Sequence, residues 1–281
     1  MMLTMQTLKL SSGKPIPILG MGTWQMGENA RNRQSEINAL RHGLDLGLSL
    51  IDTAEMYGEG GAEEVIALAI ANRRAEVFLV SKVYPHNASK QGTIAACERS
   101  LKRLNTDYLD LYLLHWRGSV PLAETLDAFQ TLQQAGKICS YGVSNFDVKD
   151  LEEASHLNGG NAIATNQVLY NLTRRGIEWN LLPWCQQHSM PIMAYSPIEQ
   201  GRLLNNQTLT AIAQEREVTA AQVAIAWLLH QDNVIVIPKA SRVEHIEQNY
   251  TALDLKLSAD ELATLDAAFP PPTKLVPLEM L

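Results

Sequence analysis

The chain has 281 residues, a formal net charge of −7 and a hydrophobic share of 46%. This length suits a single α/β barrel, and an acidic chain without a basic cluster does not fit a nucleic-acid-binding protein. No stretch reaches the roughly 18 apolar residues that span a bilayer, and the first residues lack a secretory signal pattern, so we expect a cytoplasmic protein without a membrane partner.

The cysteines and the absence of a linker limit the possible metal sites and the number of domains. Cys97, Cys139 and Cys185 are scattered and lack metal-ligand spacing, which predicts reduced thiols and no metal site. No Pro- or Ser-rich linker divides the chain, so we predict one continuous domain over residues 1–281 and expect a monomer.

Apolar runs alternate with helical patterns along the chain. The eight runs cover 17–22, 48–53, 77–83, 109–116, 139–145, 162–168, 190–196 and 234–240. Helical spacing of apolar residues follows in between, for example over 94–104 and 122–132. Runs that are apolar on both faces are typical of parallel strands covered by helices. The pattern therefore predicts a (β/α)8 TIM barrel rather than an open doubly wound sheet.

Two short segments precede the first barrel strand. Residues 7–18 contain the turn-forming sequence Ser-Ser-Gly-Lys-Pro between two extended stretches. We predict an N-terminal β-hairpin that plugs one end of the barrel.

Polar side chains stand where the apolar runs stop. Because active sites of such barrels gather at the C-terminal strand ends, these side chains are expected to share one face. They are Asp52, Lys82, His115, Ser144 with Asn145, Asn166 with Gln167, Tyr195 with Ser196, and Lys239.

Each polar residue also has a purely structural interpretation, as a turn cap, a surface lysine or a hydrogen-bonded core histidine. A buried lysine needs a partner, however, and Asp52 on the neighbouring strand is the natural one for Lys82. Tyr57 lies close in sequence to Asp52, and a phenol beside an ammonium has its anionic form favoured. We therefore expect Tyr57 to lose its proton more readily than a free tyrosine and to act as a general acid.

These residues resemble the aldo-keto reductase family over nearly the whole chain. The resemblance rests on "GMGTW" (20–24), "IDTAEMYG" (51–58), "YGVSNF" (141–146), "NQVLYN" (166–171), "AYSP" (194–197) and "IPKA" (237–240), in the family's order. It implies a barrel with extra C-terminal helices and a proton-transfer tetrad of Asp52, Tyr57, Lys82 and His115. Within the family the chain is similar to small bacterial reductases of methylglyoxal and related aldehydes.

The resemblance also implies a nicotinamide cofactor, NADPH with NADH possible, bound without a Rossmann motif. Ser144, Asn145 and Gln167 would hold the carboxamide and Tyr195 would stack on the ring, although amides at such positions also open ordinary turns. The other residues implied at the cofactor are Gly22, Thr23, Trp24, Asp52, Ser196, Pro197, Lys239, Ala240, Ser241, Arg242, His245, Gln248 and Asn249.

The stretch 237–249 departs from the family's phosphate-binding pattern. Lys239 and Asn249 match it, but Ala240, His245 and Gln248 replace the usual Ser, Arg and Glu. Ser241 and Glu244 form a capping-box pattern, so a helix is predicted to start at Ser241 and to offer its N-terminus to an anion; a plain capped helix is the alternative. We expect a modest, pH-dependent preference for NADPH.

The part of the site that receives the substrate is predicted to be aromatic, and the substrate to be a small carbonyl compound. Trp24, Tyr57, Tyr84, His115 and Trp116 would line it. The segments 117–121 and 198–207 and the tail 270–281 are short, which predicts an open pocket. Two alternatives remain: a Schiff-base aldolase that uses Lys82 as nucleophile, and a cofactor-binding redox sensor with little turnover.

Overall fold

The computed structural model describes residues 5–281, so the first four residues of the predicted domain 1–281 lie outside the described range. The barrel strands are β3 (Gly20–Gly22), β4 (Leu50–Asp52), β5 (Phe78–Val83), β6 (Leu109–Leu114), β7 (Ile138–Ser144), β8 (Ile163–Leu169), β9 (Ile192–Tyr195) and β10 (Val234–Val236). The main helices that follow them are α1 (Arg33–Asp45), α2 (Gly61–Ala69), α3 (Lys90–Leu104), α4 (Leu122–Gln134), α5 (Val148–Ser155), α6 (Leu181–Gln187), α8 (Ala220–Leu229) and α9 (Val243–Thr251).

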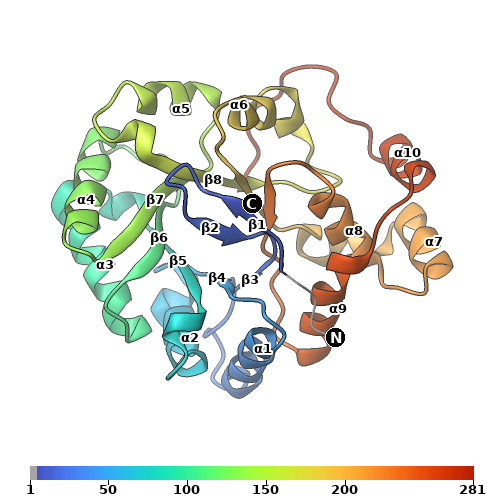
Figure 1. Ribbon diagram of the computed structural model, residues 1–281, viewed down its shortest axis with the longest axis horizontal. Helices are drawn as coiled ribbons and strands as arrows, with labels where there is room; N and C mark the ends of the chain where they lie inside the picture. Colours follow the sequence, from blue (N-terminus) through green and yellow to red (C-terminus); the bar gives the residue numbers. More distant parts are fainter. Residues whose placement is uncertain (1–4) are drawn as a thin grey trace.

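The strands form one parallel sheet in which β3 to β10 are neighbours in chain order. Two parallel bridges, Leu19 with Val236 and Gly22 with Lys239, bring the outer strands together and close the barrel. Figure 1 shows the helices as a ring around it. The predicted TIM barrel is confirmed. Each predicted strand is present, and its ends lie within a few residues of the expected ones.

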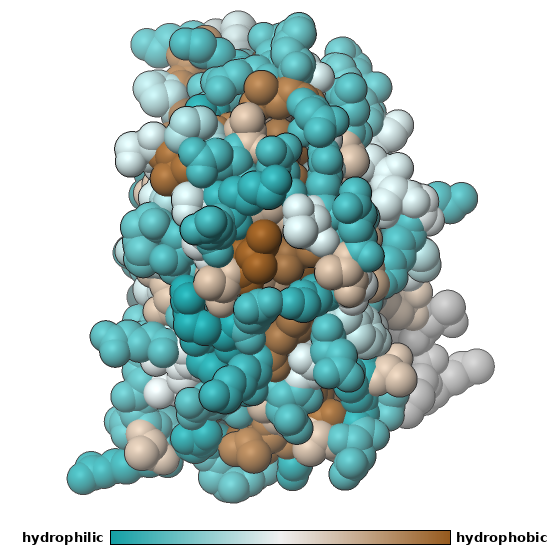
Figure 2. Space-filling model, turned by 90° about the vertical axis from the view of Figure 1, so that its left-hand side faces the viewer, coloured by the Kyte–Doolittle hydropathy of each residue, from teal (hydrophilic) through white to brown (hydrophobic). Residues whose placement is uncertain are grey.

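The core has two layers because alternate strand residues face opposite ways. Inside the barrel lie side chains such as Leu50, Val80, Leu113 and Met193. Between sheet and helices lies a larger cluster that includes Leu40 of α1. The outer faces of the helices are polar: on the side that carries α3 and α4, Figure 2 shows a hydrophilic surface with small, separate hydrophobic patches.

The predicted hairpin is present as β1 (Thr7–Lys9) and β2 (Pro15–Pro17), paired antiparallel. In Figure 1 it lies across the middle of the barrel. Its turn is tied to the N-terminal ends of the strands, since Ser11 Oγ donates to Ile163 O at 2.9 Å and Lys14 Nζ to Asp110 at 2.5 Å. The hairpin therefore closes the end opposite to the C-terminal strand ends and leaves those ends free for a site.

Two helices stand outside the βα alternation, α7 (Gln207–Glu215) after β9 and α10 (Ala259–Ala268) after α9. α10 agrees with the expected extra C-terminal structure. The prediction of a capped helix start at Ser241 is wrong: α9 begins at Val243, and its N-cap residue Arg242 makes no side-chain capping bond. Within residues 5–281, no helix is long and apolar enough to cross a membrane.

Candidate active site

Two neighbouring strands bring a carboxylate and an ammonium together inside the barrel. Asp52 ends β4 and lies opposite Val80 of β5, so Lys82, two residues further on, points into the same interior. Lys82 Nζ lies 2.8 Å from Asp52 Oδ2 and donates to Thr53 O at 2.8 Å. The side chain of Lys82 is fully buried, so its charge depends on these partners.

Tyr57 completes this arrangement from a short helical turn, Tyr57–Gly60, that follows β4. Lys82 Nζ donates its third hydrogen bond to Tyr57 Oη at 3.3 Å. The ring of Tyr57 meets the ring of His115 edge to face, with centroids 5.7 Å apart and planes at 75°. The structure thus brings all four residues of the predicted tetrad together.

Burial and charge set the protonation states here. Burial raises the pKa of Tyr57 above its usual value, although the Lys82 ammonium opposes this shift. The expectation that Tyr57 loses its proton more readily than free tyrosine is therefore wrong in this structure, and the phenol is protonated at neutral pH. Burial acts to lower the pKa of Lys82, but Asp52 and Tyr57 together raise it, so the ammonium is retained.

His115 follows β6 and is buried, and among the described residues its Nδ1 has no hydrogen-bond partner. Burial, with a smaller contribution from the Lys82 charge, lowers the pKa of His115 to about 2. The imidazole is therefore neutral at physiological pH and can orient a ligand through a hydrogen bond without carrying a charge.

A cavity of about 590 Å³ opens at the C-terminal ends of the strands, above the tetrad. Its lining includes Asp52, Tyr57 and His115, with Trp24 and Trp116 at the aromatic side. A second cavity of about 430 Å³ adjoins it and shares Ile198, Leu204, Lys239 and His245. Together they form an elongated site with an aromatic end beside Tyr57; we call the region around Lys239 and His245, where the two cavities join, the basic end.

Comparison with known proteins identifies this architecture. The model of the "Aldo/keto reductase family" matches residues 18–269. The chain belongs to the aldo/keto reductase family. It is 53% identical to Methylglyoxal reductase YeaE of Escherichia coli K12, over 98% of both chains, and 35% identical to Glyoxal reductase of Bacillus subtilis, over 93% of this chain and 92% of that one. A crystal structure of an aldo-keto reductase from Klebsiella pneumoniae in complex with NADPH superimposes with a TM-score of 0.96, at 50% identity, over 99% of this chain and all of the other.

These findings confirm the predicted family, the barrel and the class of enzyme, an aldo/keto reductase.

The predicted site residues of this reductase fall into groups according to the cavity that they line. On the cavity above the tetrad lie Gly22, Thr23, Trp24, Asp52, Tyr57, His115, Trp116, Asn145, Gln167, Tyr195, Ser196, Pro197, Lys239 and His245. Gln248 and Asn249 line the adjoining cavity. Lys82, Tyr84, Ser144, Ala240, Ser241 and Arg242 line neither, although Tyr84 packs its ring against Trp116.

The predicted carboxamide residues are held by bonds within the protein. Gln167 Nε2 donates to Asp52 Oδ1 at 2.8 Å, which fixes the second oxygen of the tetrad carboxylate. Ser144 is buried and donates to the carbonyl of Gln167. Asn145 Oδ1 accepts from Tyr195 Oη at 3.0 Å, so the phenol of Tyr195 is anchored at the rim of the cavity. Their role toward a carboxamide stays a prediction.

At the basic end, Arg242 Nη2 lies 2.6 Å from His245 Nε2, which makes that nitrogen the acceptor and the imidazole neutral. Burial lowers the pKa of His245, and Arg242 and Lys239 add to this while Glu244 opposes it. Lys239 and His245 therefore lie where the two cavities meet, with Arg242 in contact with His245 and without a capping bond at the start of α9.

Sequence reasoning missed several lining residues because they lie on irregular segments. The segment after β9 and the tail were expected only to be short and to leave an open pocket, yet both reach the cavity. The segment contributes Ile198, Gln200, Gly201 and Leu204, and the tail contributes Met280 and Leu281. Met280 and Leu281 are apolar, but no periodicity in the sequence indicates that a tail packs at the mouth of a barrel.

Proposed function

We propose that this reductase converts small aldehydes and ketones, with methylglyoxal among them, to alcohols at the expense of NADPH, with Tyr57 as the proton donor. One observation carries the proposal: the Lys82 ammonium lies between Asp52 and Tyr57, and the phenol of Tyr57 lies on the cavity wall. The names of the relatives at 53% and 35% identity support the substrate class, and the NADPH complex of the Klebsiella enzyme supports the cofactor.

The elongated site fits a dinucleotide in shape and in charge. Tyr195, anchored by Asn145, offers an aromatic face near the tetrad, and Lys239 offers positive charge beside His245 at the basic end. When bound, the nicotinamide supplies the hydride for the carbonyl carbon. The protein's part is to place the carbonyl beside Tyr57 and to exclude water from the aromatic end.

The proton step follows from the contacts around Tyr57. A carbonyl oxygen beside Tyr57 Oη accepts the phenolic proton as negative charge develops on it. The Lys82 ammonium at 3.3 Å stabilises the phenolate that remains. Asp52 and the carbonyl of Thr53 hold the ammonium in place, and the neutral imidazole of His115 orients the substrate oxygen.

The aldolase alternative does not fit this geometry. A Schiff base requires an uncharged, accessible amine. Lys82 is fully buried, donates to three partners and has a raised pKa, so it is neither. The redox-sensor alternative predicts binding without turnover and is separated by the experiment below. The single domain, the monomeric state and the cytoplasmic location stay predictions from the sequence.

Tyr57→Phe tests the proposal because it deletes only the phenolic oxygen. We expect the turnover number with methylglyoxal to fall by about 10² to 10⁴-fold, the range of general acid catalysis, while the Kd for NADPH stays close to that of the parent. Tyr84→Phe is the matched control, since Tyr84 packs its ring against Trp116 but lines neither cavity. A loss below about tenfold in Tyr57→Phe would overturn the assignment, and a parent protein that binds NADPH but turns over no aldehyde would favour the sensor.

A further inference from the structure

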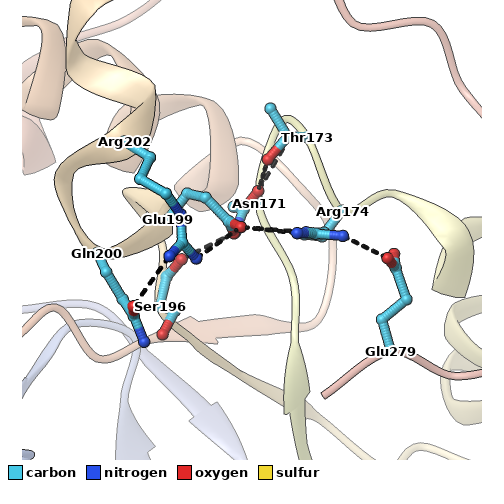
Figure 3. A network of polar contacts seen from close by, with 8 residues as sticks. All are labelled: Asn171, Thr173, Arg174, Ser196, Glu199, Gln200, Arg202 and Glu279. Atoms are coloured by element: carbon cyan, nitrogen blue, oxygen red, sulfur yellow. Dashed lines mark hydrogen bonds and ion pairs between the residues drawn. The ribbon is translucent and has the colours of Figure 1, made fainter. Parts of the chain in front are cut away.

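Two segments meet at the buried carboxylate of Glu199, and Arg174 joins the tail to them, as Figure 3 shows. Glu199 is only 4% exposed although it lies in the irregular segment 196–205 after β9. Its Oε2 accepts from Asn171 Nδ2 at 2.7 Å, and its Oε1 accepts from Arg174 and from Arg202, each at 3.0 Å. Burial acts to raise the pKa of Glu199, but these donors lower it below the usual value, so the carboxylate stays charged.

Arg174 extends this network to the tail. Its Nε and Nη2 face Glu199, while its Nη1 donates to Glu279 (Figure 3). The guanidinium therefore joins the turn after β8, the segment 196–205 and the tail. Because two nitrogens of Arg174 bind Glu199, the position of its guanidinium is fixed, and the tail carboxylate is held through it.

The next two residues of the tail, Met280 and Leu281, form a wall of the catalytic cavity. Each keeps 51% of its surface exposed, so packing alone holds them weakly. The tail before them spans a further cavity of about 510 Å³, lined by Leu275 and Leu278 on one side and by Ile177 and Leu181 on the other. A segment that bridges open space depends on its polar contacts for a defined position.

The segment 196–205 faces both cavities of the elongated site. Ile198 and Leu204 line the two cavities in common, and Gln200 lines the one above the tetrad. Ser196, Glu199 and Gln200 have positive φ angles of 50°, 50° and 56°, which are costly for non-glycine residues. Such a segment is held by its contacts, and a ligand along it adds to them.

We propose that Arg174 is a positioning residue that couples the segment 196–205 to the wall of Met280 and Leu281, so that a dinucleotide bound along this segment fixes the wall and narrows the substrate end. The inference rests on the proposed function for its ligand, NADPH. It assigns to the Glu199–Arg174–Glu279 network a role in substrate size selection that the tetrad cannot supply. The coupling is reciprocal. A variant in which NADPH stabilises the wall less should therefore also bind NADPH more weakly, by the same factor.

Hydrogen exchange of the tail tests the coupling without turnover. In the parent protein we expect NADPH to slow exchange of the amides in 275–281. In Glu279→Gln, which removes the charge but keeps the shape, we expect this slowing to shrink by about fivefold, the scale of a partly exposed ion pair. Glu279→Asp keeps the charge and should retain most of the slowing.

Asp266→Asn is the matched control. Asp266 pairs with Arg175, the neighbour of Arg174, at 2.7 Å, but it lies on α10 and away from the cavity. We expect it to leave the NADPH-dependent slowing unchanged. An NADPH effect absent from the parent, or equal in parent and Glu279→Gln, would overturn the coupling.

Steady-state kinetics then test size selection. In Glu279→Gln we expect kcat/KM for a bulky aromatic aldehyde, relative to methylglyoxal, to rise about fivefold through KM, with kcat for methylglyoxal within about twofold of the parent. An unchanged ratio would remove the wall from substrate selection. Absence of turnover in every variant would contradict the proposed function, whereas the exchange experiment would still decide the coupling.

Discussion

The two ends of the elongated site hold their charges in opposite ways. At the tetrad, Lys82 and Asp52 come from adjacent strands, are buried, and lie 2.8 Å apart, so positive charge meets its counter-charge inside the protein. At the basic end, Arg242 and His245 lie at the start of α9, partly open to solvent, and contact each other. The first arrangement is complete without a ligand. The second places the cations Lys239 and Arg242 around a neutral imidazole, an arrangement that an anion would stabilise.

The tetrad should therefore be the more sensitive end to loss of a charge. We expect Lys82→Met to lower turnover by about a hundredfold or more, because the Tyr57 phenolate loses its neighbouring cation. The free energy of unfolding should fall by about 3 kcal/mol, because Asp52 is left buried without its ion-pair partner. Turnover at saturating NADPH and urea unfolding measure the two effects.

Lys239→Met, the same substitution at the basic end, is the comparison. It should weaken NADPH binding while leaving kcat and unfolding close to the parent, since a partly exposed cation stabilises the fold little. Asp52→Asn should reduce turnover less than Lys82→Met, because Asp52 acts through Lys82. Full turnover in Lys82→Met would require abandoning the proton relay.

His115 sharpens the contrast through the pH dependence of stability. Its pKa in the folded protein is about 2, well below the ordinary value near 6.5, so the unfolded chain binds a proton between these limits and the folded protein does not. The contribution of His115 to stability is present above pH 6.5 and is lost as the pH falls. Between pH 7 and pH 5 we expect a loss of about 2 kcal/mol from this residue.

Urea unfolding of the parent and of His115→Gln at both pH values isolates this effect, because other groups titrate equally in the two proteins. The parent should lose about 2 kcal/mol more than the variant over this interval. Equal losses would mean that folding does not lower the pKa of His115 and would remove burial as the reason for a neutral imidazole.

Much of the tetrad could be predicted because its residues belong to regular elements. Asp52 and Lys82 end apolar strands, and parallel strands place their ends at one edge, so a linear pattern predicts a spatial cluster. Tyr57 follows Asp52 closely in the chain, so its position near the carboxylate could also be expected. What the pattern could not supply is the balance of burial against the Lys82 charge, which raises the pKa of Tyr57 instead of lowering it.

The rim of the site was less predictable for a physical reason. Ser241 and Glu244 match the residue pattern of a capping box, yet the helix begins two residues later, at Val243. Glu199, Arg174 and Glu279 lie on three irregular segments that only tertiary packing brings together. No period or spacing links them, and a buried glutamate in a loop has no signature in the sequence.

The smallest expected effect concerns the basic end and its histidine. In the structure His245 is a neutral acceptor from Arg242, and the charged groups that face it are Arg242, Lys239 and Glu244. A 2′-phosphate placed among them would favour the protonated imidazole, so NADPH binding should take up a proton as the pH falls, whereas NADH binding should not.

We expect the ratio of the NADH Kd to the NADPH Kd to rise by about three- to tenfold from pH 8 to pH 6, limited by protonation of the phosphate itself near pH 6. His245→Gln should flatten this profile. His42→Gln is the control, since His42 pairs with Glu247 at 3.0 Å and lines neither cavity. Because NADH lacks the phosphate, it corrects for every other titration in the site. A profile unchanged in His245→Gln would assign the pH dependence to the phosphate alone, and tighter NADH binding at both pH values would refute the preference for NADPH.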